Sequence, residues 1–104
     1  MIKYKVEISN QAKKDLKDVL IYIKDNLHEP NISKNIYKKI IDKINSLEIN
    51  PKKYQMLNHI VIKNTEVRKI TLKNYLIFYK IYEKEKEVQV LRILHNKRNW
   101  KELL

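Results

Sequence analysis

The segment from residue 67 to residue 100 constrains the fold more than any other part of the chain. Its apolar residues are mostly β-branched or aromatic, and two polar breaks divide them into three runs, one at Lys73-Asn74 and one at residues 83–86. Such runs between turn residues predict three β-strands joined by two tight turns. The middle run, Tyr75 to Tyr82, is apolar on both alternating faces, which favours a central strand over an edge strand. The sequence therefore predicts an antiparallel meander at the end of the chain.

Two amphipathic helices are predicted upstream of this meander. Residues 4–9 alternate between apolar and polar side chains, which predicts a short half-buried strand, and Ser9 or Asn10 can cap the helix that follows. Apolar residues then recur at steps of three and four and give each helix one apolar stripe. The stripes comprise Ala12, Leu16, Val19, Leu20, Ile23 and Leu27 in the first helix and Ile36, Ile40, Ile41, Ile44 and Leu47 in the second. We expect the helices to form an antiparallel hairpin whose apolar side lies on the sheet.

Prolines and polar residues mark the ends of these helices. Pro30 ends the first helix, and Ser33 is the expected N-cap of the second, which stops at Asn50-Pro51. Residues 51–59 then predict an irregular link, while residues 60–62 fit either a short strand or a loop. The link contains three expected contacts to the core, namely Tyr54, Met56 and Leu57.

The order of these elements defines the fold class. A strand, two helices and then three or four strands predict an α+β fold, in which an N-terminal strand and an antiparallel helical hairpin accompany a mainly antiparallel sheet of about four strands. We expect residues 1–104 to form a single domain. Periodicity does not give the position of the first strand in the sheet. Residues 100–104 fit one helical turn or a mobile tail.

The composition narrows the function classes. A formal net charge of +11 favours RNA, DNA, a ribosome or an acidic protein segment as the partner. The absence of cysteine excludes disulfides, thiol catalysis and cysteine-based zinc sites, and no cluster of histidines and carboxylates predicts another metal site. The absence of glycine excludes glycine-rich phosphate loops, so no cofactor is expected. Asparagine is the expected residue wherever a turn requires a positive φ, at Asn26, Asn50, Asn58, Asn64, Asn74 or Asn96.

The N-terminus gives no targeting signal. It lacks the apolar segment of a signal peptide, and no apolar run in the chain is long enough to span a bilayer. The sequence therefore predicts a cytoplasmic protein without a membrane partner.

Several stretches together resemble the RelE/ParE superfamily of toxins from type II toxin–antitoxin systems. They are the opening strand and helix YKVEISNQAKKDLKDVLIYI, the long helical hairpin, the link Asn50-Pro51-x-x-Tyr54, and the segments VRKITLKNYLIFYKIY and VLRILHNKRN. The resemblance covers nearly the whole chain, and it rests on the order and spacing of the pieces. It implies a small basic toxin, a compact α+β fold and a cognate acidic antitoxin that wraps and neutralises it.

The superfamily implies two modes of action. RelE-type members cut mRNA on the ribosome as metal-independent endoribonucleases, whereas ParE-type members bind and poison DNA gyrase. RelE-type chains often carry an arginine directly after the tyrosine that opens the middle strand, and a tyrosine about two helical turns after the last basic cluster. In this chain the tyrosine that opens the middle strand resembles Tyr75, and the residue after it is Leu76 instead of arginine. No tyrosine follows Arg98. The resemblance therefore favours the ParE-like branch, with the mRNA interferase as the alternative and a basic RNA-binding module as a third reading.

The candidate site residues lie in the first and last strands of the meander and in the segment behind them. If the chain is a nuclease, its candidate catalytic residues are Arg68, Lys69, His95 and Arg98. The candidate residues for binding the target or the antitoxin are Arg68, Arg92, His95, Lys97, Arg98 and Trp100. Cationic side chains suit phosphates and carboxylates, and a histidine can transfer protons near neutral pH.

Most of these residues also have a structural interpretation. Arg68 can form an internal salt bridge, and His95 can close a strand end by a hydrogen bond to a loop. Lys97 and Arg98 can simply form a solvated basic face. Trp100 fits either a plug in the core or a contact to the antitoxin. The sequence leaves these alternatives open.

Overall fold

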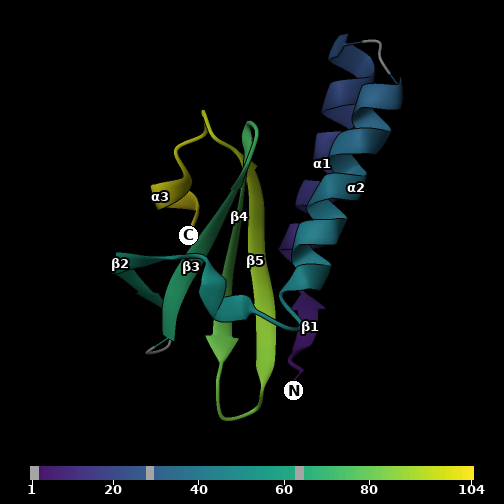
Figure 1. The fold of residues 1–104 in the computed structure, drawn as a ribbon. Coiled ribbons are helices and arrows are strands. Elements are labelled where there is room, and N and C mark those ends of the chain that lie inside the picture. Colours follow the sequence, from purple (N-terminus) through teal and green to yellow (C-terminus); the bar gives the residue numbers. More distant parts are fainter. Residues whose placement is uncertain (1–2, 28–29, 63–64) are drawn as a thin grey trace.

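The order of helices and strands follows the pattern of apolar residues along the chain. The computed structural model describes residues 3–27, 30–62 and 65–104. Its elements are β1 (Lys5–Ile8), α1 (Asn10–Leu27), α2 (Pro30–Ser46), a 3₁₀ turn (Pro51–Lys53), β2 (Gln55–Ile62), β3 (Thr65–Leu72), β4 (Tyr75–Tyr82), β5 (Glu87–His95) and α3 (Trp100–Leu103). Figure 1 shows α1 and α2 side by side as one layer against the sheet, with α3 on the other side. The predicted α+β class is confirmed.

The run that is apolar on both faces forms the central strand. β4 pairs antiparallel with both β3 and β5, and its first six residues are buried. Tyr75, Ile77 and Tyr79 pack with the helices, whereas Leu76 and Phe78 pack on the opposite side. The strand can bury both faces because each one is covered by a different part of the chain. The predicted meander of three strands is confirmed.

The sheet has five strands instead of the expected four or so, in the order β1-β5-β4-β3-β2. β1 lies at one edge and pairs parallel with β5 from Lys5↔Glu87 to Ile8↔Val90. β2 forms the other edge and pairs antiparallel with β3. The position of β1 could not be predicted because its parallel pairing joins two segments that are far apart in the sequence. The alternation of apolar and polar residues within a strand does not indicate which other strand it pairs with.

The two helical stripes form the main core with one face of the sheet. Ser9 closes the start of α1, because its Oγ accepts a hydrogen bond from the Ala12 N–H at 3.0 Å and donates one to the Leu91 carbonyl at 2.9 Å. The predicted capping role of Ser9 is thus confirmed. The predicted stripe residues that are buried in this core are Ala12, Leu16, Val19, Ile40, Ile44 and Leu47.

The second helix begins about one turn earlier than predicted. Pro30 is the first residue of α2, and Ser33, the expected N-cap, lies inside the helix. Proline is tolerated in the first turn because the N–H that it lacks has no partner within a helix there. The prediction treated Pro30 as a stop signal, although the same residue also starts the next helix.

The predicted irregular link is mostly regular. After the 3₁₀ turn at residues 51–53, β2 begins at Gln55, and residues 60–62 belong to it. Its pairing with β3 shifts register between Leu57 and Val61, which explains why a simple alternation does not reveal the strand. Of the three expected contacts to the core, Leu57 is buried and Tyr54 half-buried, but Met56 is exposed.

A smaller core on the far face of the sheet holds the C-terminus. Trp100 starts α3, and its ring lies 5.1 Å from the Phe78 ring at an interplanar angle of 34°. Leu103 and Leu104 pack on the same group of buried residues. Residues 100–104 therefore form a helical turn seated on the sheet, which decides between the two expectations for the tail.

Lysine occupies the backbone positions that were expected to carry asparagine. Among the described residues, positive φ falls on Lys73 and Lys86, at 52° each, and on no asparagine. Both residues lie in the tight turns of the meander, which require the left-handed region. Asn64, another expected turn residue, lies outside the described residues.

The turn between β4 and β5 carries a carboxylate with a lowered pKa. Hydrogen bonds lower the pKa of Glu83 to about 2, first from Lys86, then from the Tyr4 hydroxyl at 3.0 Å, while Lys52 lies 3.3 Å away. A folded-state pKa below the unfolded value gives stability that is present above about pH 4.3 and is lost as the pH falls toward 2. We expect Glu83→Gln to flatten the dependence of Tm on pH in that window. An unchanged slope would assign the acid sensitivity to another group.

Candidate functional site

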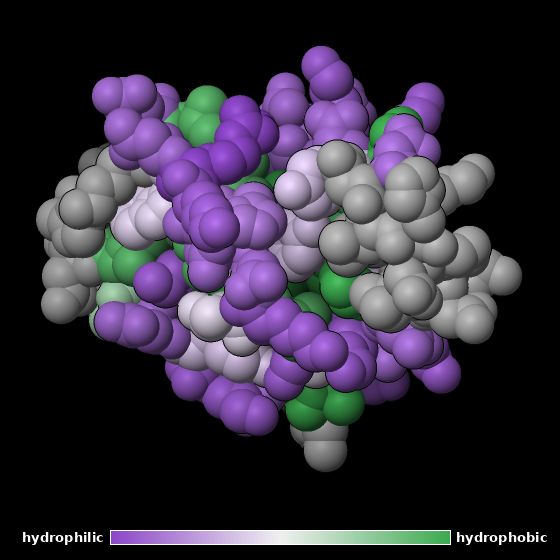
Figure 2. Space-filling model, turned by 90° about the horizontal axis from the view of Figure 1, so that it is seen from above, coloured by the Kyte–Doolittle hydropathy of each residue, from purple (hydrophilic) through white to green (hydrophobic). Residues whose placement is uncertain are grey.

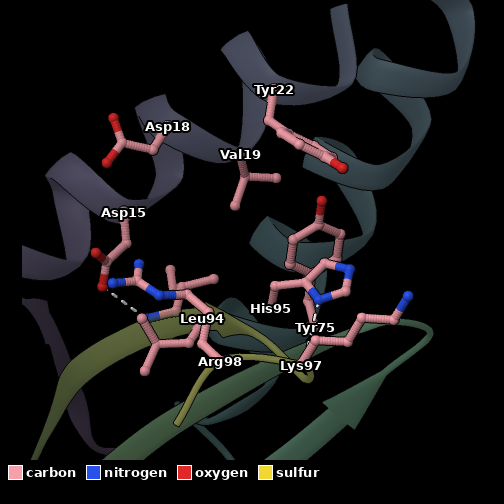
Figure 3. Close-up of a pocket in the computed structure, with 10 residues that line it drawn as sticks. Asp15, Asp18, Val19, Tyr22, Tyr75, Leu94, His95, Lys97 and Arg98 are labelled. Atoms are coloured by element: carbon pink, nitrogen blue, oxygen red, sulfur yellow. Dashed lines mark hydrogen bonds between the residues drawn. The ribbon is translucent and has the colours of Figure 1, made fainter. Parts of the chain in front are cut away.

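A pocket lies between α1 and the C-terminal end of β5. Its volume is about 400 Å³. The pocket is lined by Asp15, Asp18, Val19, Tyr22, Tyr75, Ile93, Leu94, His95, Lys97 and Arg98. Figure 3 shows α1 contributing one wall, while β4, β5 and the loop after β5 contribute the other. Three of the predicted binding residues, His95, Lys97 and Arg98, thus meet at one site.

A buried ion pair joins α1 to β5 beside this pocket. The Asp15 carboxylate is almost fully buried and accepts hydrogen bonds from Arg92 Nε at 2.8 Å, from Arg92 Nη2 at 3.1 Å and from the Ile93 N–H at 2.9 Å. The pairing of β1 with β5 ends at Ile8 and Val90, so the edge of β5 beyond Val90 has no neighbouring strand there. Asp15 accepts the hydrogen bond of the Ile93 N–H on this edge, which a longer β1 would otherwise have accepted. Arg92, predicted as a binding residue, is thus held by α1.

Tyr75 and His95 form the aromatic side of the pocket. Their ring centroids are 5.4 Å apart at an interplanar angle of 82°. His95 Nδ1 accepts a hydrogen bond from the Lys97 N–H at 3.1 Å, so the neutral ring carries its proton on Nε2. Burial, and then the nearby Tyr22, raise the pKa of Tyr75 above its usual value. His95 thus forms the hydrogen bond to the following loop that its structural interpretation requires.

Lys97 and Arg98 extend from a loop that the backbone holds in place. The Asn96 N–H donates to the Asn74 carbonyl at 2.8 Å, and the Arg98 N–H donates to the His95 carbonyl at 3.0 Å. Both cationic side chains are exposed. In Figure 3 the Arg98 guanidinium points toward the α1 wall, and the Lys97 side chain extends to the other side. Figure 2 shows the molecule from above, with hydrophilic residues over most of the coloured surface.

The other two candidate catalytic residues lie elsewhere. Arg68 Nη1 donates to the carbonyls of Lys52 at 3.1 Å and Tyr54 at 2.8 Å, so its guanidinium secures the turn before β2. Lys69 lies next to it on β3 and places its Nζ 5.7 Å from the centre of the Trp100 ring, on the far face of the sheet. The structure therefore brings His95 and Arg98 together but leaves Arg68 and Lys69 outside the pocket.

Sequence reasoning missed the α1 side of the site. Asp15 falls within the apolar stripe, three residues after Ala12 and four before Val19, and a carboxylate in such a position signals a buried partner. Asp18 and Tyr22 carry no comparable signal, because they lie next to the stripe on an exposed helix surface. Among the described residues, no group of three or more histidines and carboxylates is placed to hold a metal ion.

Comparisons with known proteins agree with this architecture. Residues 6–100 match the family described as the ParE toxin of the type II toxin–antitoxin system parDE. No curated protein gives a significant match by sequence. No helix in the described part of the chain is long and apolar enough to cross a membrane.

Three solved structures share the fold at low sequence identity. A chromosomal ParDE toxin–antitoxin system from Pseudomonas aeruginosa has a TM-score of 0.71 at 18% identity, covering 89% of this chain and 96% of that one. An archaeal RelE–RelB complex from Pyrococcus horikoshii has a TM-score of 0.67 at 20% identity, covering 93% and 99%. A RelBE toxin–antitoxin complex from Mycobacterium tuberculosis has a TM-score of 0.60 at 18% identity, covering 90% and 99%. ParE-type and RelE-type proteins thus share the fold about equally.

Proposed function

This chain belongs to the family of ParE toxins of type II toxin–antitoxin systems, and from this premise we propose that it arrests growth by binding and poisoning DNA gyrase. We further propose that a cognate acidic antitoxin neutralises it. The fold alone does not choose between gyrase and the ribosome, because solved structures of both branches resemble it. The proposal therefore depends on how the candidate residues are arranged.

The observation that supports a binding toxin is the separation of the candidate catalytic residues. Arg68 pairs with Tyr79 of β4, whereas His95 pairs with Tyr75 of the same strand. Four residues along a strand correspond to about 13 Å. Metal-independent RNA cleavage requires a base, an acid and positive charge around one phosphate. The four candidates are not assembled for this task, whereas a binding surface requires no such assembly.

Two further positions agree with this proposal. Leu76, where the resemblance to the nuclease branch would place an arginine, is buried and packs with Phe78 on the far face of the sheet. Trp100, the aromatic residue that the chain offers after Arg98, rests against the same buried group. Both positions contribute to packing instead of presenting a catalytic side chain.

One observation favours the alternative, ribosome-dependent mRNA cleavage. His95 and Arg98 line the same pocket, so an imidazole, the side chain most often used for proton transfer, lies near a cation. This pair alone supplies one proton-transfer group and one positive charge. The alternative therefore needs a residue from the ribosome or the mRNA to complete the chemistry.

Pulse labelling after induction of the toxin tests the proposed target. We expect DNA synthesis to fall and the DNA-damage response to rise first, with translation following later. His95→Ala serves as the matched variant, because a binding toxin should tolerate it unless the imidazole is part of the contact surface. Three results together would show that the gyrase proposal is wrong. Translation would stop before DNA synthesis, mRNA would be cut at ribosomal A-site codons, and His95→Ala would lose this cleavage.

A further inference from the structure

The pocket beside α1 has walls of opposite charge. Asp18 lines it from α1 with an exposed side chain, whereas the neighbouring Asp15 carboxylate is buried against Arg92. Lys97 and Arg98 line it from the loop after β5. In a chain with a net charge of +11, an acidic wall at this place is unexpected, and it sets the pocket apart from a general basic surface.

The floor between these walls is apolar. It is formed by Val19 and Ile93, which are buried, and by the largely buried ring of Tyr75. A pocket of about 400 Å³ lies within the range that accepts small molecules and is roomy enough for one large side chain. Aromatic side chains that insert into such pockets are frequent energetic centres of protein interfaces. The floor is therefore suited to a single apolar or aromatic anchor.

The acidic wall argues against a nucleic acid as the occupant. A nucleic-acid backbone presents charge of one sign at regular intervals, so its phosphates would meet Asp18 as well as Lys97 and Arg98. A polypeptide can place charges of both signs on the two sides of an anchor residue. The arrangement of the walls therefore fits a protein segment.

We propose that this pocket is the docking site for an anchor residue of the antitoxin, with an acidic residue on the side of Lys97 and Arg98 and a basic residue on the side of Asp18. The inference rests on the antitoxin half of the proposed function and is independent of whether gyrase is the target. It differs from the expectation of a merely acidic partner, because it requires a positive charge on the antitoxin at the α1 wall. Complementary charges on both walls fix the register and suppress wrong partners.

Reversing the charge of Asp18 distinguishes a purely acidic antitoxin segment from one that also carries a basic residue at the α1 wall. We expect Asp18→Lys to raise the Kd for the antitoxin about tenfold or more, measured by isothermal titration calorimetry with the purified product of the adjacent small open reading frame. Asp18→Asn, which removes the charge without adding bulk, should raise the Kd by a smaller factor. A purely acidic segment would bind Asp18→Lys as tightly as the wild type or more tightly, and that outcome overturns the inference.

A matched variant controls for net charge. Asp42 is exposed on α2 and is not part of the pocket, and Asp42→Lys makes the same change in net charge, so its Kd should stay within about twofold of the wild type. Exposed substitutions of this kind leave the fold intact, which circular dichroism checks. If Asp18→Lys fails to fold, Asp18→Asn decides: an unchanged Kd in that variant overturns the inference.

The outcomes separate the failure of this inference from the failure of the proposed function. If the wild type binds the product and Asp18→Lys binds equally well, only the docking chemistry is wrong. If the wild type binds no such product, the antitoxin half of the proposed function is wrong, and the inference falls with it. A basic-to-acidic exchange on the antitoxin that restores binding to Asp18→Lys would identify the predicted partner charge directly.

Discussion

Replacement of Arg92 with alanine should lower the free energy of unfolding by about 3–5 kcal/mol. The change removes both guanidinium hydrogen bonds to Asp15 and leaves a buried carboxylate whose remaining contacts are the Ile93 amide and the side-chain amide of Gln11 at 3.4 Å. An uncompensated buried charge is among the most destabilising features in a protein. Urea unfolding, followed by circular dichroism, measures the effect.

Two control variants make this result specific. Arg92→Lys keeps the charge but cannot form the bidentate contact, so it should destabilise the protein less than alanine does but still measurably. Lys5→Ala breaks the exposed pair with Glu7, whose atoms are 3.0 Å apart, and should have a far smaller effect. If Arg92→Ala costs no more than Lys5→Ala, the pair with Asp15 is not what holds β5 against α1.

The parts of the fold that depend on local sequence patterns can be predicted from the sequence, whereas pairings between distant segments cannot. β4 is predictable because a run that is apolar on both faces has to be central, and the helical stripes are predictable because their spacing repeats. β1 is predicted as a strand, but its parallel pairing with β5 is not predicted. The alternation in residues 5–8 does not indicate that they pair with residues 87–90. β2 is anticipated only at residues 60–62, as one of two alternatives, because its register shift interrupts the alternation.

The site shows the same division between local and distant information. The basic cluster of His95, Lys97 and Arg98 is local in sequence, and the structure keeps these residues together at one pocket. The contribution of α1 is not local, because Asp15 meets Arg92 across 77 positions of the chain. Arg68 and Lys69 illustrate the opposite error, since the sequence suggests grouping them with His95, but the register of the sheet keeps them apart.

Reversal of Lys97 and Arg98 to glutamate should remove most of the toxicity while leaving the fold intact. Both side chains are exposed, and the hydrogen bonds that hold their loop are made by backbone groups and by the His95 ring. The free energy of unfolding should therefore change little. Electrostatic steering toward an acidic or DNA-bound target accelerates association by about 10–10³-fold, and a reversed charge at the contact surface removes that advantage. Colony formation after induction, together with a thermal melt of the purified variant, measures both effects.

The matched control is Lys13→Glu with Lys17→Glu, which changes the net charge equally. Both lysines are exposed on the face of α1 that points away from the pocket, since they lie about half a turn from Asp15. This variant should remain toxic if the position of the positive charge matters, and should lose toxicity if only the total charge does. Full toxicity of the Lys97 and Arg98 variant would move the active surface away from the end of β5. Loss of its folding would show instead that the two cations belong to an internal ion-pair network.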